Sequence, residues 1–244
     1  MPKTDGFGAR SYEIARRSRV STIMGFALRQ GISFCRVGDR IIFLDILADR
    51  YFCLAPGAER HFSAWVEGGD PAPQDAQLQG LLAHGLLTPS TSSQAPTACG
   101  AIRIPQTSIL DLGLAAPGGA ATIRALYGLT YVRLRLKTTG LGRTLAWLSR
   151  RKAGLPTSSM PSDAHVAQIM AGFIGASRFA TQLDNCLAHS LAVASTMIAK
   201  GLQPDIVLGV QLGPFSAHCW VQHDDRLVND RFDMVRTFTP ILIL

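Results

Sequence analysis

The sequence predicts an α+β protein in two parts, and the order of its apolar patterns carries that prediction. Strand-like runs followed by helical patterns fill residues 1–90, which we assign to a first domain. A Ser-, Thr- and Pro-rich stretch without charge over 88–98 marks the boundary, and we assign residues 91–119 to a linker and the entry to a second domain. In residues 120–244, helical patterns come before strand-like runs, an order typical of α+β domains.

Three apolar runs in the first part predict a three-stranded meander. Residues 32–37 alternate between apolar and polar side chains, and short turn sequences separate them from the runs at 41–47 and 51–54. Pro56 suits the first turn of a following helix, and Gly85 suits the end of a second one. The first part is therefore expected to be a small domain of three strands plus helices.

Helical spacing dominates the first half of the second part, and strand-like runs follow it. Gly140 and Gly142 are expected to divide the first of these helices in two. The pattern predicts helices over about 120–152, 162–180 and 186–200, and strands over 206–211, 217–222 and 226–229.

Positive charge is concentrated in the middle of the chain. The formal net charge is +7, but residues 1–90 contribute +1, residues 91–180 contribute +8 and residues 181–244 contribute −2. A local basic stretch is compatible with nucleic acid or with an acidic partner surface. The apolar fraction of 47% excludes a largely disordered chain.

The cysteine pattern and the lengths of the apolar runs indicate the cellular compartment in which the protein is expected. No apolar run approaches the roughly 18 residues of a transmembrane segment, and Val20–Leu28 is too short and polar for a secretory signal. The five cysteines lie far apart without a C-x-x-C pair, which argues against a disulfide framework or a structural zinc site. We therefore expect a cytoplasmic protein that needs no metal and no cofactor.

Candidate catalytic groups gather near the end of the chain. Cys186 is predicted in the first turn of a helix, where unpaired amides and the helix dipole favour a thiolate. His218 follows on a predicted strand and Asp230 at the end of the next. A nucleophilic cysteine needs a histidine within reach and a third group to orient it, and this order suits papain-like and transglutaminase-like cores.

Each of these residues also has an ordinary structural interpretation. A cysteine in an apolar helix, or a histidine on an apolar strand, is typical of a buried core residue. Gln182 is a candidate oxyanion donor alongside the Cys186 amide, although a surface glutamine is the more typical interpretation. Cys219 is expected to face away from His218 because side chains alternate along a strand. The alternatives to Asp230 as the third group are Asp224, Asp225 and Asp233.

Several strings of the sequence resemble the leader peptidase of lasso-peptide biosynthesis, the B protein family with a transglutaminase-like fold. The catalytic half carries Leu183-Asp184-Asn185-Cys186-Leu187-Ala188-His189-Ser190-Leu191, Pro214-Phe215-Ser216-Ala217-His218-Cys219-Trp220-Val221 and Val228-Asn229-Asp230. The amino-terminal half carries Phe34-Cys35-Arg36-Val37, Asp49-Arg50-Tyr51-Phe52-Cys53-Leu54 and Gly85-Leu86-Leu87, which look like the precursor-recognition domain fused to these peptidases. That domain is winged-helix-like. His189 departs from the family, which often has Arg there.

The resemblance implies a role for each matching residue. Cys186 would be the nucleophile, His218 the base and then the acid, and Asp230 the group that orients it, while Asp184 and Asn185 would cap the helix. The first domain would bind the leader of a ribosomal precursor peptide along an exposed sheet edge. Its candidate leader-binding residues are Tyr51, Phe52, Cys53 and Leu54. The resemblance also implies an asparagine-synthetase-like macrolactam cyclase as partner.

Two other functions remain open at this point. An acyl transferase of transglutaminase type would use the same groups but pass the acyl-enzyme to an amine instead of water. A winged-helix DNA-binding regulator would use the basic middle segment. The near-neutral first domain is poor for phosphate contacts, so we expect no nucleic-acid partner.

Overall fold

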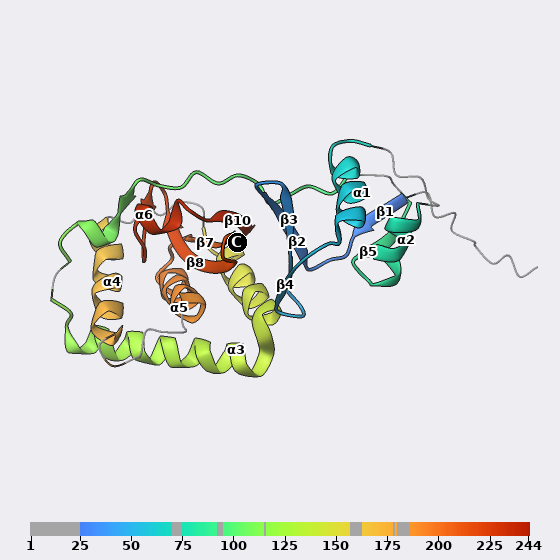
Figure 1. Ribbon diagram of the computed structural model, residues 1–244. Helices are drawn as coiled ribbons and strands as arrows, with labels where there is room; N and C mark the ends of the chain where they lie inside the picture. Colours follow the sequence, from blue (N-terminus) through green and yellow to red (C-terminus); the bar gives the residue numbers. More distant parts are fainter. Residues whose placement is uncertain are drawn as a thin grey trace, which may run out of the picture.

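The computed structural model describes residues 25–69, 75–91, 95–114, 116–156, 163–177, 179 and 186–244, which form a mixed α+β fold (Figure 1). The helices are α1 (Pro56–Val66), α2 (Ala76–Ala83), α3 (Gly119–Ala153), α4 (Asp163–Ser177), α5 (Cys186–Ala199) and α6 (Phe232–Val235), with a short 3-10 helix over Ile109–Asp111. The strands are β1 (Gly25–Leu28), β2 (Ile32–Val37), β3 (Arg40–Asp45), β4 (Arg50–Cys53), β5 (Leu87–Ser90), β6 (Thr107–Ser108), β7 (Asp205–Gln211), β8 (Ser216–His223), β9 (Arg226–Leu227) and β10 (Thr239–Ile243).

The amino-terminal part contains the expected meander, with strand order β2-β3-β4. Pro56 begins α1, where a missing N–H costs no helical hydrogen bond, and Gly85 follows α2 with a φ of 70°. The sequence did not predict β1 and β5, which pair antiparallel as a second, two-stranded sheet. α1 and α2 lie on the side of the meander that faces away from the rest of the molecule (Figure 1).

The β2–β4 sheet packs on both of its faces, because its side chains alternate. On the face toward α1, the rings of Phe34 and Phe43 meet Phe62 edge-on, with centroids 5.2 and 5.0 Å away. On the opposite face, Ile42 and Leu44 belong to the same apolar core as α3, α4 and α5. This sheet therefore lies between two cores and ties the amino-terminal part to the carboxy-terminal part.

The carboxy-terminal sheet has the strand order β10-β7-β8-β9-β6, and it connects to the meander through its edge strand β10. The Ser33 hydroxyl of β2 donates to the backbone carbonyl of Ile241 in β10. α5 and α3 cover one face, while Trp220, Val235 and Phe238 form a smaller core on the other. The sequence did not predict β10 or β6, and β6, from the segment assigned as a linker, pairs parallel with β9.

Helix α3 bends at Gly140, whose φ of 76° and ψ of 174° are not helical, so the predicted division occurs at this residue. Gly142 has another use. A Cβ there would lie 3.1 Å from Leu47 Cδ2 and 3.3 Å from the carbonyl oxygen of Ile46. The glycine therefore lets the turn between β3 and β4 pack closely against the helix.

The basic middle of the sequence is mostly the exposed surface of α3. Its eight Lys and Arg residues occur without a single Asp or Glu. Two of them flank one aromatic ring, since the guanidinium carbons of Arg135 and Arg151 lie 4.6 and 5.2 Å from the centroid of Trp147. In the part of the chain that the structure describes, no helix has both the length and the apolar character needed to cross a bilayer.

Candidate active site

Cys186 is the first residue of α5, and its side chain reaches solvent. The hydrogen bond with His218 is the main cause of the lowered pKa of the Cys186 thiol. Partial burial of the thiol acts in the opposite direction and raises its pKa. The charge of His218 and the backbone amides of Cys219 and Leu187 lower the pKa further. The first turn of a helix adds unpaired N–H groups, which favour the same anion.

His218 lies on β8 and connects the thiol to Asp230. Its Nε2 is 2.5 Å from Asp230 Oδ2, and both side chains are largely buried. Burial alone would lower the pKa of His218, but the hydrogen bonds to Asp230 and Cys186, together with the charges of these groups, raise it to about 9. The histidine is therefore protonated at neutral pH.

A lowered thiol pKa beside a raised imidazole pKa favours transfer of the Cys186 proton to His218, which forms a thiolate–imidazolium pair. Such a pair contains both groups that acyl transfer requires. The thiolate is a nucleophile, and the imidazolium can protonate a leaving amine. Asp230 fixes the ring through Nε2, and this leaves the other ring nitrogen of His218 for Cys186.

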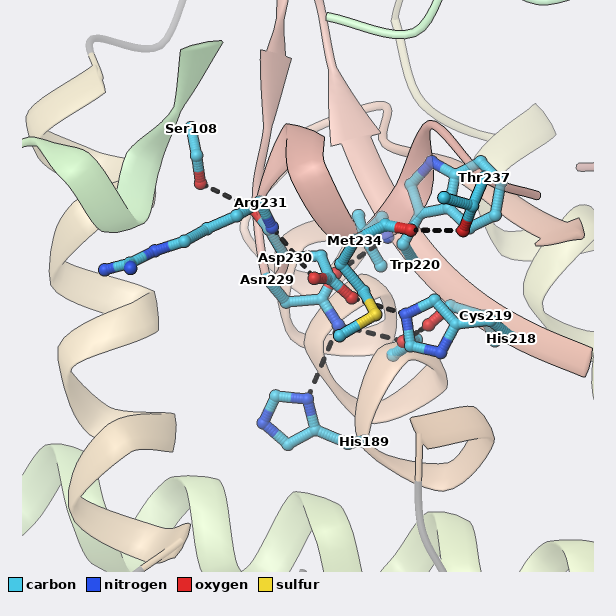
Figure 2. A network of polar contacts seen from close by, with 12 residues as sticks. Ser108, His189, His218, Cys219, Trp220, Asn229, Asp230, Arg231, Met234 and Thr237 are labelled. Carbon is cyan, nitrogen blue, oxygen red and sulfur yellow. Dashed lines mark hydrogen bonds and ion pairs between the residues drawn. The ribbon is translucent and has the colours of Figure 1, made fainter. Parts of the chain in front are cut away.

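Asp230 and the end of β8 are held by a polar network that the sequence did not predict (Figure 2). The Ser108 hydroxyl of β6 donates to the backbone carbonyl of Asp230 at 2.6 Å, and the Arg231 amide donates to Asp230 Oδ1 at 2.8 Å. Asn229 accepts from the Val221 amide at 2.8 Å and donates to the Ser190 hydroxyl at 2.8 Å. This network fixes the loop after β9 against β8 and α5.

Two residues in this network, Asn229 and Ser190, were partly indicated by the sequence. Asn229 precedes Asp230, and Ser190 lies one turn into the helix that Cys186 begins. The Ser190 hydroxyl donates to the Cys219 carbonyl at 2.6 Å and so links α5 to β8. Nothing in the sequence indicated the role of Ser108, because this residue is more than 100 positions away from Asp230 and bonds to its backbone carbonyl.

The structure separates the other acidic candidates from His218. Asp233 pairs with Arg236 at 3.5 Å, and Asp224 lies in the turn after β8, 3.7 Å from His223. Asp225 is in the same turn. Cys219 faces the core, as the alternation of the strand predicted, and burial strongly raises its pKa. Gln182, Asp184 and Asn185 lie outside the described residues.

His189 packs beneath the site and is distinct from the reactive pair. Its ring meets Phe173 edge-on with centroids 5.4 Å apart, and its Nδ1 is 3.4 Å from Asn229 Nδ2 (Figure 2). Burial lowers its pKa; the charge of Arg133 also lowers it, whereas that of Asp230 raises it. A neutral packing role next to Asn229 fits these contacts.

The predicted leader-binding residues divide between two places. Phe52, Cys53 and Leu54 line a groove of about 540 Å³ between the end of β4 and α2, whose far wall includes Gln77 and Leu81. β4 is the edge of its sheet and pairs only with β3 among the described residues. Tyr51 is not part of that groove. It packs on the opposite side, against the core of the carboxy-terminal part.

A helix that begins with a cysteine packs on antiparallel strands, of which β8 carries the histidine and β9 leads into the loop with the aspartate, and this arrangement is typical of α+β cysteine enzymes. Residues 128–243 match the profile of the transglutaminase-like superfamily, so the chain contains a transglutaminase-like domain. No significant match was found among curated proteins or among solved structures. The superfamily match is compatible with cysteine peptidase or acyltransferase activity.

Proposed function

We propose that this protein is a cysteine peptidase that removes the leader from a ribosomally made precursor, as the lasso-peptide B proteins that its sequence resembles do. The observation that carries the proposal is the hydrogen-bonded series Cys186–His218–Asp230, with the thiol at the solvent-exposed start of α5. The transglutaminase-like match over 128–243 supports a cysteine-dependent acyl transfer.

The proposed reaction follows from the protonation states of the pair. The Cys186 thiolate attacks the scissile carbonyl and forms a tetrahedral intermediate. His218 then gives its proton to the departing amine as the C–N bond breaks, which leaves an acyl-enzyme. Neutral His218 next takes a proton from water as the water attacks the thioester. This step releases the carboxylate product and restores the thiolate–imidazolium pair.

We further propose that the leader binds in the groove beside β4. An edge strand presents unpaired N–H and C=O groups, and an extended peptide can satisfy them by pairing as an additional strand. Phe52 and Leu54 would supply apolar contacts from the strand, and Leu81 from α2. Winged-helix-like precursor recognition by the first 90 residues is part of this proposal.

A macrolactam cyclase of asparagine-synthetase type is the partner that this proposal requires. Cleavage creates a free amino terminus on the core peptide, and ring closure consumes it. Direct transfer between two associated enzymes would protect that amine. Five of the eight basic residues of α3 are exposed, namely Arg124, Lys137, Arg143, Arg150 and Arg151, and an acidic partner surface could pair with them.

The test is incubation of the purified protein with the precursor peptide encoded beside its gene, followed by mass spectrometry. We expect free leader and free core from the wild type and none from Cys186→Ala. Cys99→Ser is the matched control, because Cys99 is a free thiol outside the site, and it should cleave normally. Unchanged cleavage by Cys186→Ala would refute the nucleophile. A leader–amine adduct in place of free leader would favour the acyl transferase.

A further inference from the structure

Tyr51 brings an amino-terminal side chain to the turn that leads into β8, the strand of His218. It lies on β4 opposite Leu44 of β3, on the face of the meander that shares the carboxy-terminal core. Burial raises the pKa of its hydroxyl, and negative charge on Cys219, Asp49 and Cys186 raises it further.

Phe215 meets Tyr51 from the catalytic side. It lies three positions before His218, in the turn that leads into β8, and the centroids of the two rings are 5.5 Å apart at an angle of 56°. Phe215 is nonetheless 50% exposed. A half-exposed aromatic ring in the turn that enters the strand of His218 leaves apolar surface uncovered at the end of that strand from which a peptide could approach the site.

Phe52, the residue after Tyr51 on β4, lies on the opposite face of the meander. Phe52 stacks on Phe43, with centroids 5.2 Å apart, and lines the groove toward α2 together with Leu54. One short edge strand therefore carries Phe52 on the face toward α2 and Tyr51 on the other, while Cys53 borders the groove at the end of the strand. Successive side chains of a strand point to opposite faces, so this division follows from the pleat itself.

We propose that Tyr51 and Phe215 contact the substrate beside the scissile bond, so that β4 takes part in both leader binding and cleavage. The proposal rests on the proposed peptidase function and adds two specificity-determining residues to it. The aromatic pair would hold the apolar side chains next to the cleaved bond. Pairing of the leader with β4 would at the same time fix the strand that carries Tyr51.

The experiment compares neighbouring positions on the same strand in the full chain, with the precursor encoded beside the gene as substrate. Tyr51→Ala and Phe215→Ala should each lower kcat about tenfold at saturating precursor, the amount expected for one lost aromatic contact. Their affinity for a fluorescent leader peptide should stay within about twofold of wild type. Leu54→Ala should do the reverse, weakening leader affinity about tenfold with little change in kcat.

Three further measurements separate contact with substrate from a structural effect. Tyr51→Phe keeps the ring and should retain wild-type kcat, and Tyr127→Ala, an exposed tyrosine on α3, should change nothing. The rate at which iodoacetamide modifies Cys186, followed on its own peptide by mass spectrometry, should be the same in Tyr51→Ala and wild type. That rate reports the thiolate without any bound peptide.

The outcomes distinguish this inference from the function on which it rests. If the wild type releases no free leader and core, the peptidase proposal fails and the inference fails with it. If the wild type cleaves but Tyr51→Ala and Phe215→Ala keep their kcat, only the inference fails. A Cys186 alkylation rate that falls in Tyr51→Ala as much as cleavage does would also overturn it, because Tyr51 would then act on the thiol.

Discussion

Each part of the molecule contains a carboxylate that is largely shielded from solvent, Asp45 in the amino-terminal part and Asp230 in the carboxy-terminal part. The two carboxylates have different kinds of hydrogen-bond partner. In the amino-terminal part, Asp45 is 3% exposed and sits at the end of β3. It accepts from Arg29 Nη2 at 2.6 Å and from the backbone amides of Leu47 and Ala48 at 3.2 and 3.0 Å. These donors are one guanidinium and two backbone amides, so Asp45 closes a turn and forms an ion pair.

Asp230 in the carboxy-terminal part has one fixed partner and one titratable partner. The Arg231 amide donates to Oδ1, while Oδ2 faces His218 Nε2, and His218 in turn reaches the exposed thiol of Cys186. A proton can therefore move at this site, which is not possible around Asp45. The comparison indicates that the nature of the partners, more than burial itself, distinguishes the proposed catalytic carboxylate from the structural one.

The largest effect should come from removing the charge of Asp230. Asp230→Asn keeps the shape of the side chain but no longer stabilises the imidazolium, so cleavage of the precursor should fall about a thousandfold. Thermal unfolding should change little, because the Arg231 amide and the Ser108 contact to the Asp230 carbonyl remain. A variant that cleaves within tenfold of wild type would mean that Asp230 does not support His218.

Asp45→Asn should show the opposite behaviour. The change leaves Arg29 without its buried anion and weakens the acceptors for two turn amides, so unfolding free energy should fall by about 2 kcal/mol. The loss stays below that of a fully buried pair because Arg29 is 30% exposed. Denaturant unfolding measures this, and kcat per folded molecule should be unchanged. A kcat loss comparable to that of Asp230→Asn would remove the distinction between the two carboxylates.

The pattern that made the catalytic half predictable is local. Cys186 begins a helix, His218 lies on a strand and Asp230 follows the next strand, and each of these placements depends on a few neighbouring residues. The strand before Asp230 ends at Leu227, two residues earlier than predicted. The meander and the break at Gly140 are predictable for the same reason. What joins these elements is not local. β10, the β6–β9 pairing and the Ser108 contact with Asp230 depend on residues that are far apart in the sequence.

The sequence also did not predict which face of the meander each aromatic side chain of β4 occupies. Both Tyr51 and Phe52 are aromatic, and nothing in the local pattern states which of them faces α2. A sheet with one solvated face would show apolar and polar residues in alternation, but β3 reads Ile-Ile-Phe-Leu because both faces are buried. The continuous apolar run was thus a signal that the meander packs between two cores.

The pH dependence of cleavage should also differ between the Asp230→Asn and Asp45→Asn variants, although this effect is smaller. Wild-type kcat/KM should fall as pH rises through about 9, because His218 then loses the proton that it gives to the leaving amine. In Asp230→Asn, burial still lowers the pKa of His218 but its strongest opposing partner is gone, so this limb should move at least about one unit lower. Asp45→Asn should keep the wild-type profile. An unmoved limb in Asp230→Asn would show that another group titrates there.

The smallest effect should come from an exposed carboxylate, which completes the comparison. Glu67 pairs with Arg36 at 2.9 Å, much as Asp45 pairs with Arg29, but the two side chains are 63% and 47% exposed. Water and salt screen this pair and solvate each charge once the partner is gone, so Glu67→Gln should change unfolding free energy by about 0.5 kcal/mol or less. Denaturant unfolding at low and high salt checks this. A loss as large as that of Asp45→Asn would mean that the Arg36 pair helps to hold α1 on the meander, since Arg36 also donates to Ser63 of that helix at 3.2 Å.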